Sequence, residues 1–237
     1  MRRLAPSSRE TWSEAKRRSE LLGATPREFQ LDCDWTESSR DRFFGFTRDV
    51  ERVSGVTLSA TIRLHQIKYR EKTGVPPVSR GMLMFYNMGK FSAEVGDRAI
   101  FDATTAEKYL SRVDDYPLPL DVALPIWSWT VHLRDDRVVD LLQSTDPDEL
   151  PQLDFVVPGG LDRFVETRNA FLHGALLRQG DVLKVERMAP RDTQAAADLL
   201  LPHLAPATRN VALFDLSERN LQRHAKDTLS VLFDSLR

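Results

Sequence analysis

Apolar and polar residues recur along this chain with two different periods. Residues 57–66 alternate strictly, with Leu58 and Ile62 among the apolar positions and polar residues between them, which is typical of a strand with one buried face. Residues 38–53 instead repeat apolar positions every three to four residues, as an amphipathic helix does. The pattern therefore predicts strands and helices in alternation.

The same patterns predict elements along the whole sequence. Strands are expected over residues 29–35, 57–66, 81–88, 120–129 and 210–216, with a less regular sixth over 181–188. Helices are expected over residues 8–22, 38–53, 104–113, 161–173, 192–204 and from 217 onward, and loops over 73–79 and 144–160. Ser7 and Glu10 have the spacing of a capping box at the first helix. Thr104 and Glu107 have it at the third, and Gly55 stands where the second helix ends.

This order of elements predicts the fold class. Strands joined by helices pair in parallel through right-handed crossovers, so we expect an α/β fold resembling a (β/α)8 TIM barrel. It would form one domain over residues 1–237, with a long loop or insertion at about 144–190. A complete barrel has eight strand–helix units over roughly 250 residues, and here the first units are missing, which leaves a partial barrel of about strands 4 to 8. The chain is then truncated, or folds as an open sheet, or closes as a homo-oligomer with a second copy.

Composition narrows the expected partners. The chain has 237 residues, of which 41% are hydrophobic and 29% charged, with a formal net charge of −2. This balance argues against nucleic acid as a partner, because phosphate binding needs a concentrated cationic surface. The basic stretch from Arg2 to Arg18 is interleaved with glutamates and is typical of a solvated helix face. Cys33 is the only cysteine, so no internal disulfide can form.

Membrane and cofactor signals are absent from the sequence. No apolar run is long enough to cross a bilayer, and none follows the N-terminal arginines as it would in a signal peptide. The chain as written is expected to be cytoplasmic, and a missing N-terminal segment would make it secreted or a lipoprotein. The histidines lack metal-binding spacing, and the glycine pair at 159–160 lacks a nucleotide-loop context. We therefore expect no metal and no other cofactor.

Polar and aromatic side chains stand where the predicted strands end, which in a parallel barrel is the mouth of the active site. The candidate site residues are Asp32, Asp34, Arg63, His65, Tyr86, Asn87, Trp127, Trp129 and Asp215. Asp34 and Asp32 are the candidate catalytic carboxylates, and the others are candidates for binding substrate. Cys33 alternates with the two aspartates, so it is expected in the core.

Two interpretations of these strand ends stay open. The aspartates of the first strand either neutralise Arg63 in an ion-pair network or line a pocket for a polyhydroxyl ligand. The two tryptophans of the fourth strand are two residues apart and share a face. They either fill the core or form, with Tyr86 and Trp35, a platform on which a sugar ring stacks.

These strand ends resemble the chitinase-like glycosidases of family 18. Residues 30–35 (Gln-Leu-Asp-Cys-Asp-Trp) resemble that family's fourth barrel strand, residues 84–87 (Met-Phe-Tyr-Asn) its sixth, and residues 124–127 the start of its seventh. Residues 32–36 and 118–125 resemble more closely a group of uncharacterised bacterial (β/α)-barrel proteins of glycosidase type, some of them lipoproteins. The resemblance implies a barrel that binds or hydrolyses a carbohydrate.

Departures from the family pattern argue against chitinase chemistry. Thr36 stands where the resemblance places the general-acid Glu, and a hydroxyl cannot protonate a glycosidic oxygen as a tuned carboxylic acid does. Glu37 comes next but is expected in the first turn of the following helix. Asn87 replaces an Asp that helps hold the substrate's acetamido group, and Phe29 stands in place of the first motif Asp.

Three functional hypotheses follow. The first is a glycoside hydrolase that acts on a polysaccharide or glycan through Asp34, with Asp32, His65 or Asp215 as its partner. The second is a non-catalytic sugar-binding barrel, and the third is a truncated remnant without independent activity. From the sequence alone, catalysis stays an open question.

Overall fold

The computed structural model describes residues 7–94, 96–205 and 209–236. Two compact units make up the chain. The first comprises Met1–Met84, Tyr109–Val122 and His203–Asn210, and the second comprises Phe85–Lys108, Ala123–Pro202 and Val211–Arg237. Arg2 and Arg3 of the basic N-terminal stretch lie outside the described residues.

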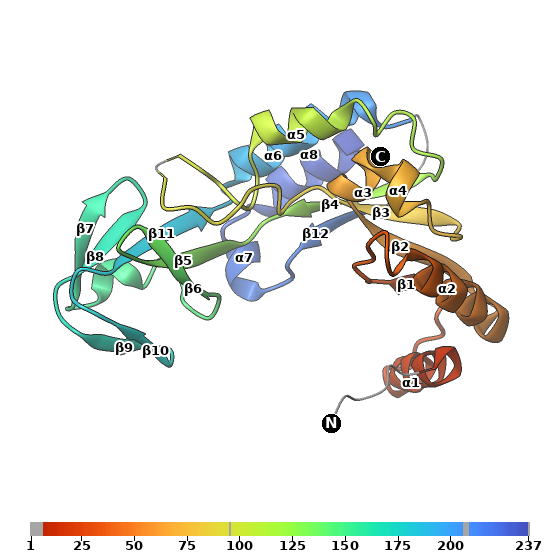
Figure 1. The fold of residues 1–237 in the computed structure, drawn as a ribbon, viewed down its shortest axis with the longest axis horizontal. Helices are drawn as coiled ribbons and strands as arrows, with labels where there is room; N and C mark the ends of the chain where they lie inside the picture. The colour runs from red at the N-terminus through yellow and green to blue at the C-terminus, as the bar shows by residue number, and fades with distance from the viewer. Residues whose placement is uncertain (1–6, 95, 206–208, 237) are drawn as a thin grey trace. The chain divides into compact units, whose positions relative to one another are not determined.

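The first unit begins with alternating helices and strands, as the hydrophobic pattern predicts (Figure 1). Its elements are α1 (Ser8–Leu21), β1 (Glu28–Leu31), α2 (Arg40–Ser54), β2 (Thr57–Arg63), α3 (Leu64–Lys68), α4 (Arg70–Thr73) and β3 (Arg80–Met84). Ser7 and Glu10 form the predicted capping box at α1. Gly55 ends α2 in the left-handed conformation, with φ of 66°, which costs glycine little because it has no Cβ.

A five-stranded parallel sheet has the order β1-β2-β3-β4-β12, where β4 is Leu120–Pro125 and β12 is Val211–Phe214. β1 pairs with β2 and β2 with β3 in parallel register. The amides of Gly81 and Phe85 donate to the carbonyls of Pro119 and Ala123, so β3 and β4 advance in the same direction. The predicted α/β class is confirmed, and the sheet is consistent with part of a barrel. In the described residues this sheet has five strands rather than eight.

The second unit contains an antiparallel sheet that the sequence patterns did not predict. Its strand order is β6-β5-β11-β8-β7. The elements are β5 (Ser128–Arg134), β6 (Arg137–Leu142), η1 (Leu150–Gln152), β7 (Val156–Gly160), β8 (Arg163–Glu166), β9 (Ala170–Leu172), β10 (Ala175–Leu177) and β11 (Val182–Arg187). β9 and β10 form a separate hairpin. Leu150, Leu177 and Leu183 are fully buried in the core between these elements.

The remaining helices are α5 (Ala103–Leu110), α6 (Pro190–Leu200), η2 (Leu201–His203), α7 (Glu218–Gln222) and α8 (Lys226–Leu236). α5 starts one residue before the predicted capping box, and the Asp102 side chain accepts from the Thr105 amide instead. The single closing helix expected from residue 217 is two helices, α7 and α8, of which α7 is capped by Ser217.

Several predicted elements differ from the structure in type or extent. The loop expected over residues 144–160 contains η1 and β7, and the strands expected over residues 29–35, 57–66 and 81–88 end earlier, at Leu31, Arg63 and Met84. Residues 161–173 form β8 and β9 rather than a helix, because Val165 and Phe164 pair with Val182 and Leu183 of β11. The strand expected over residues 120–129 is two strands, since β4 ends at Pro125 and β5 starts at Ser128. Proline has no amide hydrogen to continue a ladder, and it stands where the chain leaves the parallel sheet for the antiparallel one.

Two buried acidic residues lie in the second unit: Glu166 in β8 and Asp181 directly before β11. Asp181 accepts from Arg134 and from the Arg178 amide, and it lies 2.7 Å from His132 Nε2. Glu166 is only 1% exposed, and neither of its carboxylate oxygens has a hydrogen-bond partner in the described residues. Burial, together with the charge of Asp181, raises the pKa of Glu166 to about 7.

We expect Glu166→Gln to remove a pH-dependent loss of stability. The pKa of Glu166 is about 7 in the fold against an ordinary value of 4.5, so the folded protein keeps a proton that the unfolded chain has released. Its contribution to stability is complete below pH 4.5 and is lost as the pH rises through the folded-state pKa, a change of up to about 3 kcal/mol. Denaturant unfolding between pH about 5 and about 8 should give a flatter pH dependence for the variant. Parallel pH profiles for the two proteins would contradict this.

Candidate functional site

The nine candidate site residues fall into two groups, one in each unit. Asp32, Asp34, Arg63 and His65 belong to the first unit. Tyr86, Asn87, Trp127, Trp129 and Asp215 belong to the second. Each group has its own contacts, and four of the five residues in the second group line one cavity.

In the first unit, the two aspartates lie just beyond the carboxyl end of β1, which ends at Leu31. Asp34 forms an ion pair with Arg63 at the end of β2, and the Thr61 hydroxyl donates to Asp32 at 2.8 Å. The Asp34 side chain remains 59% exposed. The ion-pair interpretation therefore describes the Asp34–Arg63 contact, while the carboxylates stay open to solvent.

Three neighbouring expectations need correction. His65 lies in the first turn of α3 rather than on a strand, and partial burial followed by the charge of Arg63 lowers its pKa. Cys33 is exposed rather than in the core, because β1 ends two residues earlier and its alternation does not reach Cys33. Glu37 lies in a turn before α2 rather than in the first turn of the helix.

Trp35 is a core residue and not part of a sugar platform. Its ring stacks on Phe43 at a centroid distance of 4.8 Å, and its indole nitrogen donates to the Thr73 carbonyl at 2.9 Å. Both contacts are structural, because α2 packs against the ring and the last residue of α4 accepts the hydrogen bond.

In the second unit, a cavity of about 550 Å³ gathers four of the five candidate residues. The residues that line it are Asn87, Trp127, Ser128, Trp129, Gln143, Ser144, Phe214, Asp215, Ser217, Arg219 and Asn220. Tyr86 is not among the lining residues and packs against them instead. The volume is in the range of small-molecule sites.

Aromatic rings form one wall of this cavity. Trp127 meets Trp129 edge to face at 5.8 Å and Phe214 at 5.3 Å between ring centroids. Tyr86 stacks on Phe214 at 5.4 Å. Trp127 and Trp129 are each 8% exposed, while Phe214 is 48% exposed, so Phe214 offers the most open ring surface. The two tryptophans do not share a strand, because Trp127 lies in the link between β4 and β5.

Polar groups form the rest of the lining, and the chain holds several of them in place. The Asn220 side-chain amide donates to Asp215. The backbone amide of Asn220 donates to the Ser217 hydroxyl at the start of α7. Arg219 Nε lies 2.8 Å from Asp146 Oδ2. A carboxylate, three carboxamides and a guanidinium thus stand beside an aromatic wall.

Arg223 fixes α7 to the surrounding segments. Its guanidinium donates to Asp146 at 2.5 Å, to Asp148 at 2.6 Å and to the Ser128 hydroxyl at 3.0 Å. Asp148 also pairs with Arg187 of β11 at 2.7 Å. Because α7 supplies two of the cavity's lining residues, this ion-pair network holds that side of the cavity.

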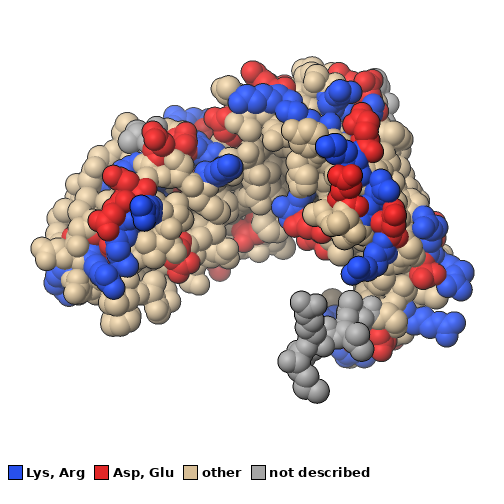
Figure 2. Space-filling model, in the orientation of Figure 1, with Lys and Arg blue, Asp and Glu red and all other residues tan. Residues whose placement is uncertain are grey.

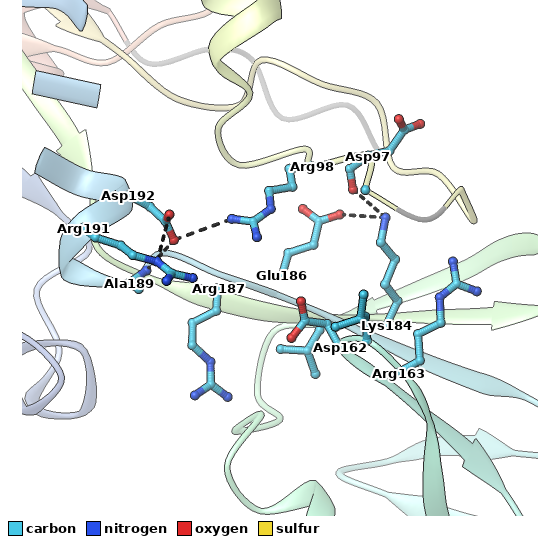
Figure 3. Close-up of a pocket in the computed structure, with 13 residues that line it drawn as sticks. Asp97, Arg98, Asp162, Arg163, Lys184, Glu186, Arg187, Ala189, Arg191 and Asp192 are labelled. Atoms are coloured by element: carbon cyan, nitrogen blue, oxygen red, sulfur yellow. Dashed lines mark hydrogen bonds and ion pairs between the residues drawn. The ribbon is translucent and has the colours of Figure 1, made fainter. Parts of the chain in front are cut away.

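A second cavity of about 460 Å³ in the same unit is lined by charged residues of both signs (Figure 3). Lys184 and Glu186 of β11 are buried there and lie 3.4 Å apart. Lys184 also donates to the Asp97 carbonyl at 2.7 Å. Glu186 Oε2 accepts from the Trp129 indole at 3.0 Å and from the Ala99 amide at 2.8 Å. The buried pair therefore positions the edge of Trp129.

Sequence reasoning missed Phe214, Arg219 and Asn220 in the cavity lining. Phe214 is the last residue of β12. The rule that functional groups stand at strand ends selected the next residue, Asp215, instead. Arg219 and Asn220 lie in α7, in a segment that the apolar periodicity assigned to one uniform helix. The capping position of Ser217 was the available signal for a short, separate helix there.

Several further observations concern the described residues as a whole. They contain no cluster of three or more potential metal ligands, and no helix among residues 7–94, 96–205 and 209–236 is long and apolar enough to cross a membrane. On the face shown in Figure 2, basic and acidic side chains are interspersed.

The fold is similar to that of solved glycosidases. The Bacillus cereus spore cortex-lytic enzyme SleL matches 96% of this chain with a TM-score of 0.55 and 15% identity. Chitinase ChiW from Paenibacillus sp. str. FPU-7 matches 97% of this chain with a TM-score of 0.52 and 11% identity. The Ostrinia furnacalis Group IV chitinase matches 97% with a TM-score of 0.50 and 10% identity. The fold relationship that the strand-end motifs implied is thereby confirmed.

The similarity is one of fold, and it covers only part of the length of each known protein. This chain spans 53% of the SleL chain, 30% of ChiW and 72% of the Ostrinia chitinase. No protein-family profile matches the sequence, and no curated protein matches it. The activities of those enzymes therefore enter only as a basis for a proposal.

Proposed function

We propose that this chain is a carbohydrate-active barrel protein whose second-unit cavity binds a sugar ring of a glycan. The observation that carries the proposal is the composition of the cavity wall: Trp127, Trp129 and Phe214 line the same space of about 550 Å³ as Asn87 and Asp215. The fold likeness to glycosidases supports it.

The two kinds of lining group match the two kinds of sugar surface. The face of a pyranose ring carries C–H groups, which pack on an aromatic ring such as Phe214. The edge of the ring carries hydroxyls, which can donate to Asp215 and both donate to and accept from Asn87 and Asn220. Such a combination of apolar area and a few placed polar groups is typical of ligand sites.

Direct titration of the whole chain with short oligosaccharides tests the proposal. Isothermal calorimetry with chitotriose, cellotriose, xylotriose and trigalacturonate should give saturable binding for at least one of them. The intrinsic fluorescence of Trp127 and Trp129 should change on binding, because both rings line the cavity. If none of the four sugars binds at millimolar concentration while the protein melts cooperatively, the proposal is wrong. A melt without a cooperative transition would favour the remnant hypothesis.

A second candidate function is hydrolysis of a glycosidic bond, and the solvent-open carboxylates of the first unit favour it. Asp34 and Asp32 stand at the carboxyl end of β1, where barrel enzymes place catalytic groups. Glycosidases use two carboxyl groups, one as acid and one as base or nucleophile. Thr36 provides neither, so Asp34 with Asp32 or His65 would have to serve.

If the chain hydrolyses a glycan, we expect Asp34→Asn to lower the turnover rate by about 10²–10⁴-fold, the usual contribution of a general acid or base. Asp49→Asn is a matched control, because Asp49 is an exposed helix aspartate paired with Arg52. Reducing-sugar release from a polysaccharide panel measures both. Equal rates for wild type and Asp34→Asn would exclude Asp34 from the reaction.

A further inference from the structure

We infer that the cavity of the second unit selects sugars that carry a carboxylate, and that Arg219 is the residue that recognises it. The inference rests on the proposed sugar-binding function and adds a substrate class to it. Uronic acids and amino sugars with a carboxyl-bearing ether substituent share this chemistry.

The Arg219 guanidinium has N–H donors that are available to a ligand. Its side chain lines the cavity and is 47% exposed. Only Nε is engaged, at 2.8 Å from Asp146 Oδ2, and in the described part of the chain Asp146 is its only ion-pair partner. The guanidinium has five N–H donors, so the two terminal nitrogens remain for a ligand or for water.

The carboxylate that pairs with Arg219 also pairs with a second arginine. Asp146 offers one oxygen to Arg219 and the other to Arg223, at 2.8 and 2.5 Å. Asp148 is likewise divided between Arg187 and Arg223. The network therefore holds three guanidinium groups and two carboxylates, one positive charge more than the carboxylates match.

The other charge in the cavity does not neutralise Arg219. Asp215 lines the same space, but it accepts from the Asn220 side-chain amide. Among the described residues, no ion pair within 4.0 Å joins Asp215 to Arg219. Asp215 is thus available to sugar hydroxyls, and Arg219 to an anionic group.

A planar guanidinium distinguishes a carboxylate from a hydroxyl. It binds a carboxylate through two parallel hydrogen bonds, which a single hydroxyl cannot reproduce. The network with Asp146 and Arg223 orients Arg219 before the ligand arrives, so little conformational entropy is lost on binding. Because Arg219 is half exposed, we expect a modest preference of about tenfold in Kd, or about 1.4 kcal/mol.

The decisive comparison removes the ligand's negative charges and keeps its sugar rings and linkages. Calorimetry of the whole chain with trigalacturonate and with its fully methyl-esterified form should give a Kd about tenfold lower for the acid. Chitotriose serves as a neutral amino sugar, and the disaccharide of N-acetylglucosamine and N-acetylmuramic acid as a carboxyl-bearing one. The uronate and muramate arms show which source of the carboxylate the cavity accepts.

Arg219→Gln should abolish the preference for the acid, so that the acid and its methyl ester bind to the variant with Kd values within about twofold of each other. Arg219→Lys should retain part of it, because the charge remains and the planar fork is lost. Arg191→Gln is the matched control, since Arg191 is 85% exposed and lines the other cavity.

The two proposals fail in different ways. Equal wild-type affinity for acid and ester, with measurable binding of both, overturns the role of Arg219 and leaves the sugar-binding function standing. A preference that survives in Arg219→Gln also overturns it. Absence of binding to every probe overturns the sugar-binding function itself, and the selectivity with it.

Discussion

Asp181→Ala is expected to lower the free energy of unfolding by about 3–5 kcal/mol at neutral pH, the usual cost of removing one partner from a buried ion pair. Asp181 is 2% exposed and accepts from Arg134 through both oxygens, at 2.8 and 2.7 Å. His132, also buried, lies 2.7 Å from it. The substitution leaves the guanidinium, the imidazole and the Arg178 amide without their acceptor.

Denaturant unfolding, followed by the fluorescence of Trp129 in β5, measures this loss. Asp154→Ala is the matched control in the same unit, because Asp154 pairs with Arg168 at the surface, where the two side chains are 80% and 56% exposed. Such a pair contributes about 0–1 kcal/mol. A loss for Asp181→Ala no larger than that of the control would show that the buried cluster does not stabilise the sheet.

The effect of Asp181 should depend on pH. Hydrogen bonds and ion pairing outweigh the cost of burial and lower the pKa of Asp181. Its stabilising contribution is therefore present above the ordinary carboxyl pKa and is lost as the pH falls through the lower folded-state value. The gap in stability between wild type and Asp181→Ala should narrow in acid, opposite to the trend that Glu166 produces.

The local signals in the sequence predicted the first unit well. The capping box of Ser7 and Glu10 and the glycine at position 55 act within a few residues, so their geometry follows from the sequence itself. The alternation at residues 57–63 likewise predicted the strand β2, although both of its faces are buried, because Ser59 and Thr61 are buried as well as Leu58 and Ile62. These elements need little knowledge of distant partners.

The antiparallel sheet could not be predicted in the same way. β7 and β8 have five and four residues, and their pairing depends on β11, which lies further along the chain. Such short strands gain their stability from non-local neighbours rather than from their own propensity. Residues 161–173 have apolar residues at helical spacing, so the local pattern predicts a helix there, whereas pairing with distant strands makes the segment β8 and β9.

The candidate site was predicted in part, and its limits have a physical cause. The rule that strand ends carry functional groups found Asn87, Trp127 and Asp215, which line one cavity. It assumed that each strand continued to its last apolar residue, and β2 and β4 both end earlier. For this reason His65 moves onto a helix, and Trp127 into a link between two sheets.

Trp127→Ala is expected to lower the affinity for a bound sugar by at least about tenfold, because stacking on one aromatic side chain contributes of the order of 1 kcal/mol or more. It should also cost about 3–5 kcal/mol in stability, as Trp to Ala substitutions in packed sites do. The ring is 8% exposed and touches Tyr86, Trp129 and Phe214. Calorimetry with the tightest-binding oligosaccharide measures the first effect, and thermal melting the second.

Phe214→Ala and Trp12→Ala separate binding from folding. Phe214 lines the cavity but is 48% exposed, so its removal should weaken sugar binding with a smaller loss of stability than Trp127→Ala. Trp12 lies in α1, packs on Phe29 at 5.7 Å and does not line this cavity, so Trp12→Ala should leave the sugar affinity unchanged. If Phe214→Ala keeps wild-type affinity while Trp127→Ala loses it in proportion to the unfolded fraction, the aromatic wall is packing alone. If both cavity variants lose affinity while folded, the rings contact the sugar.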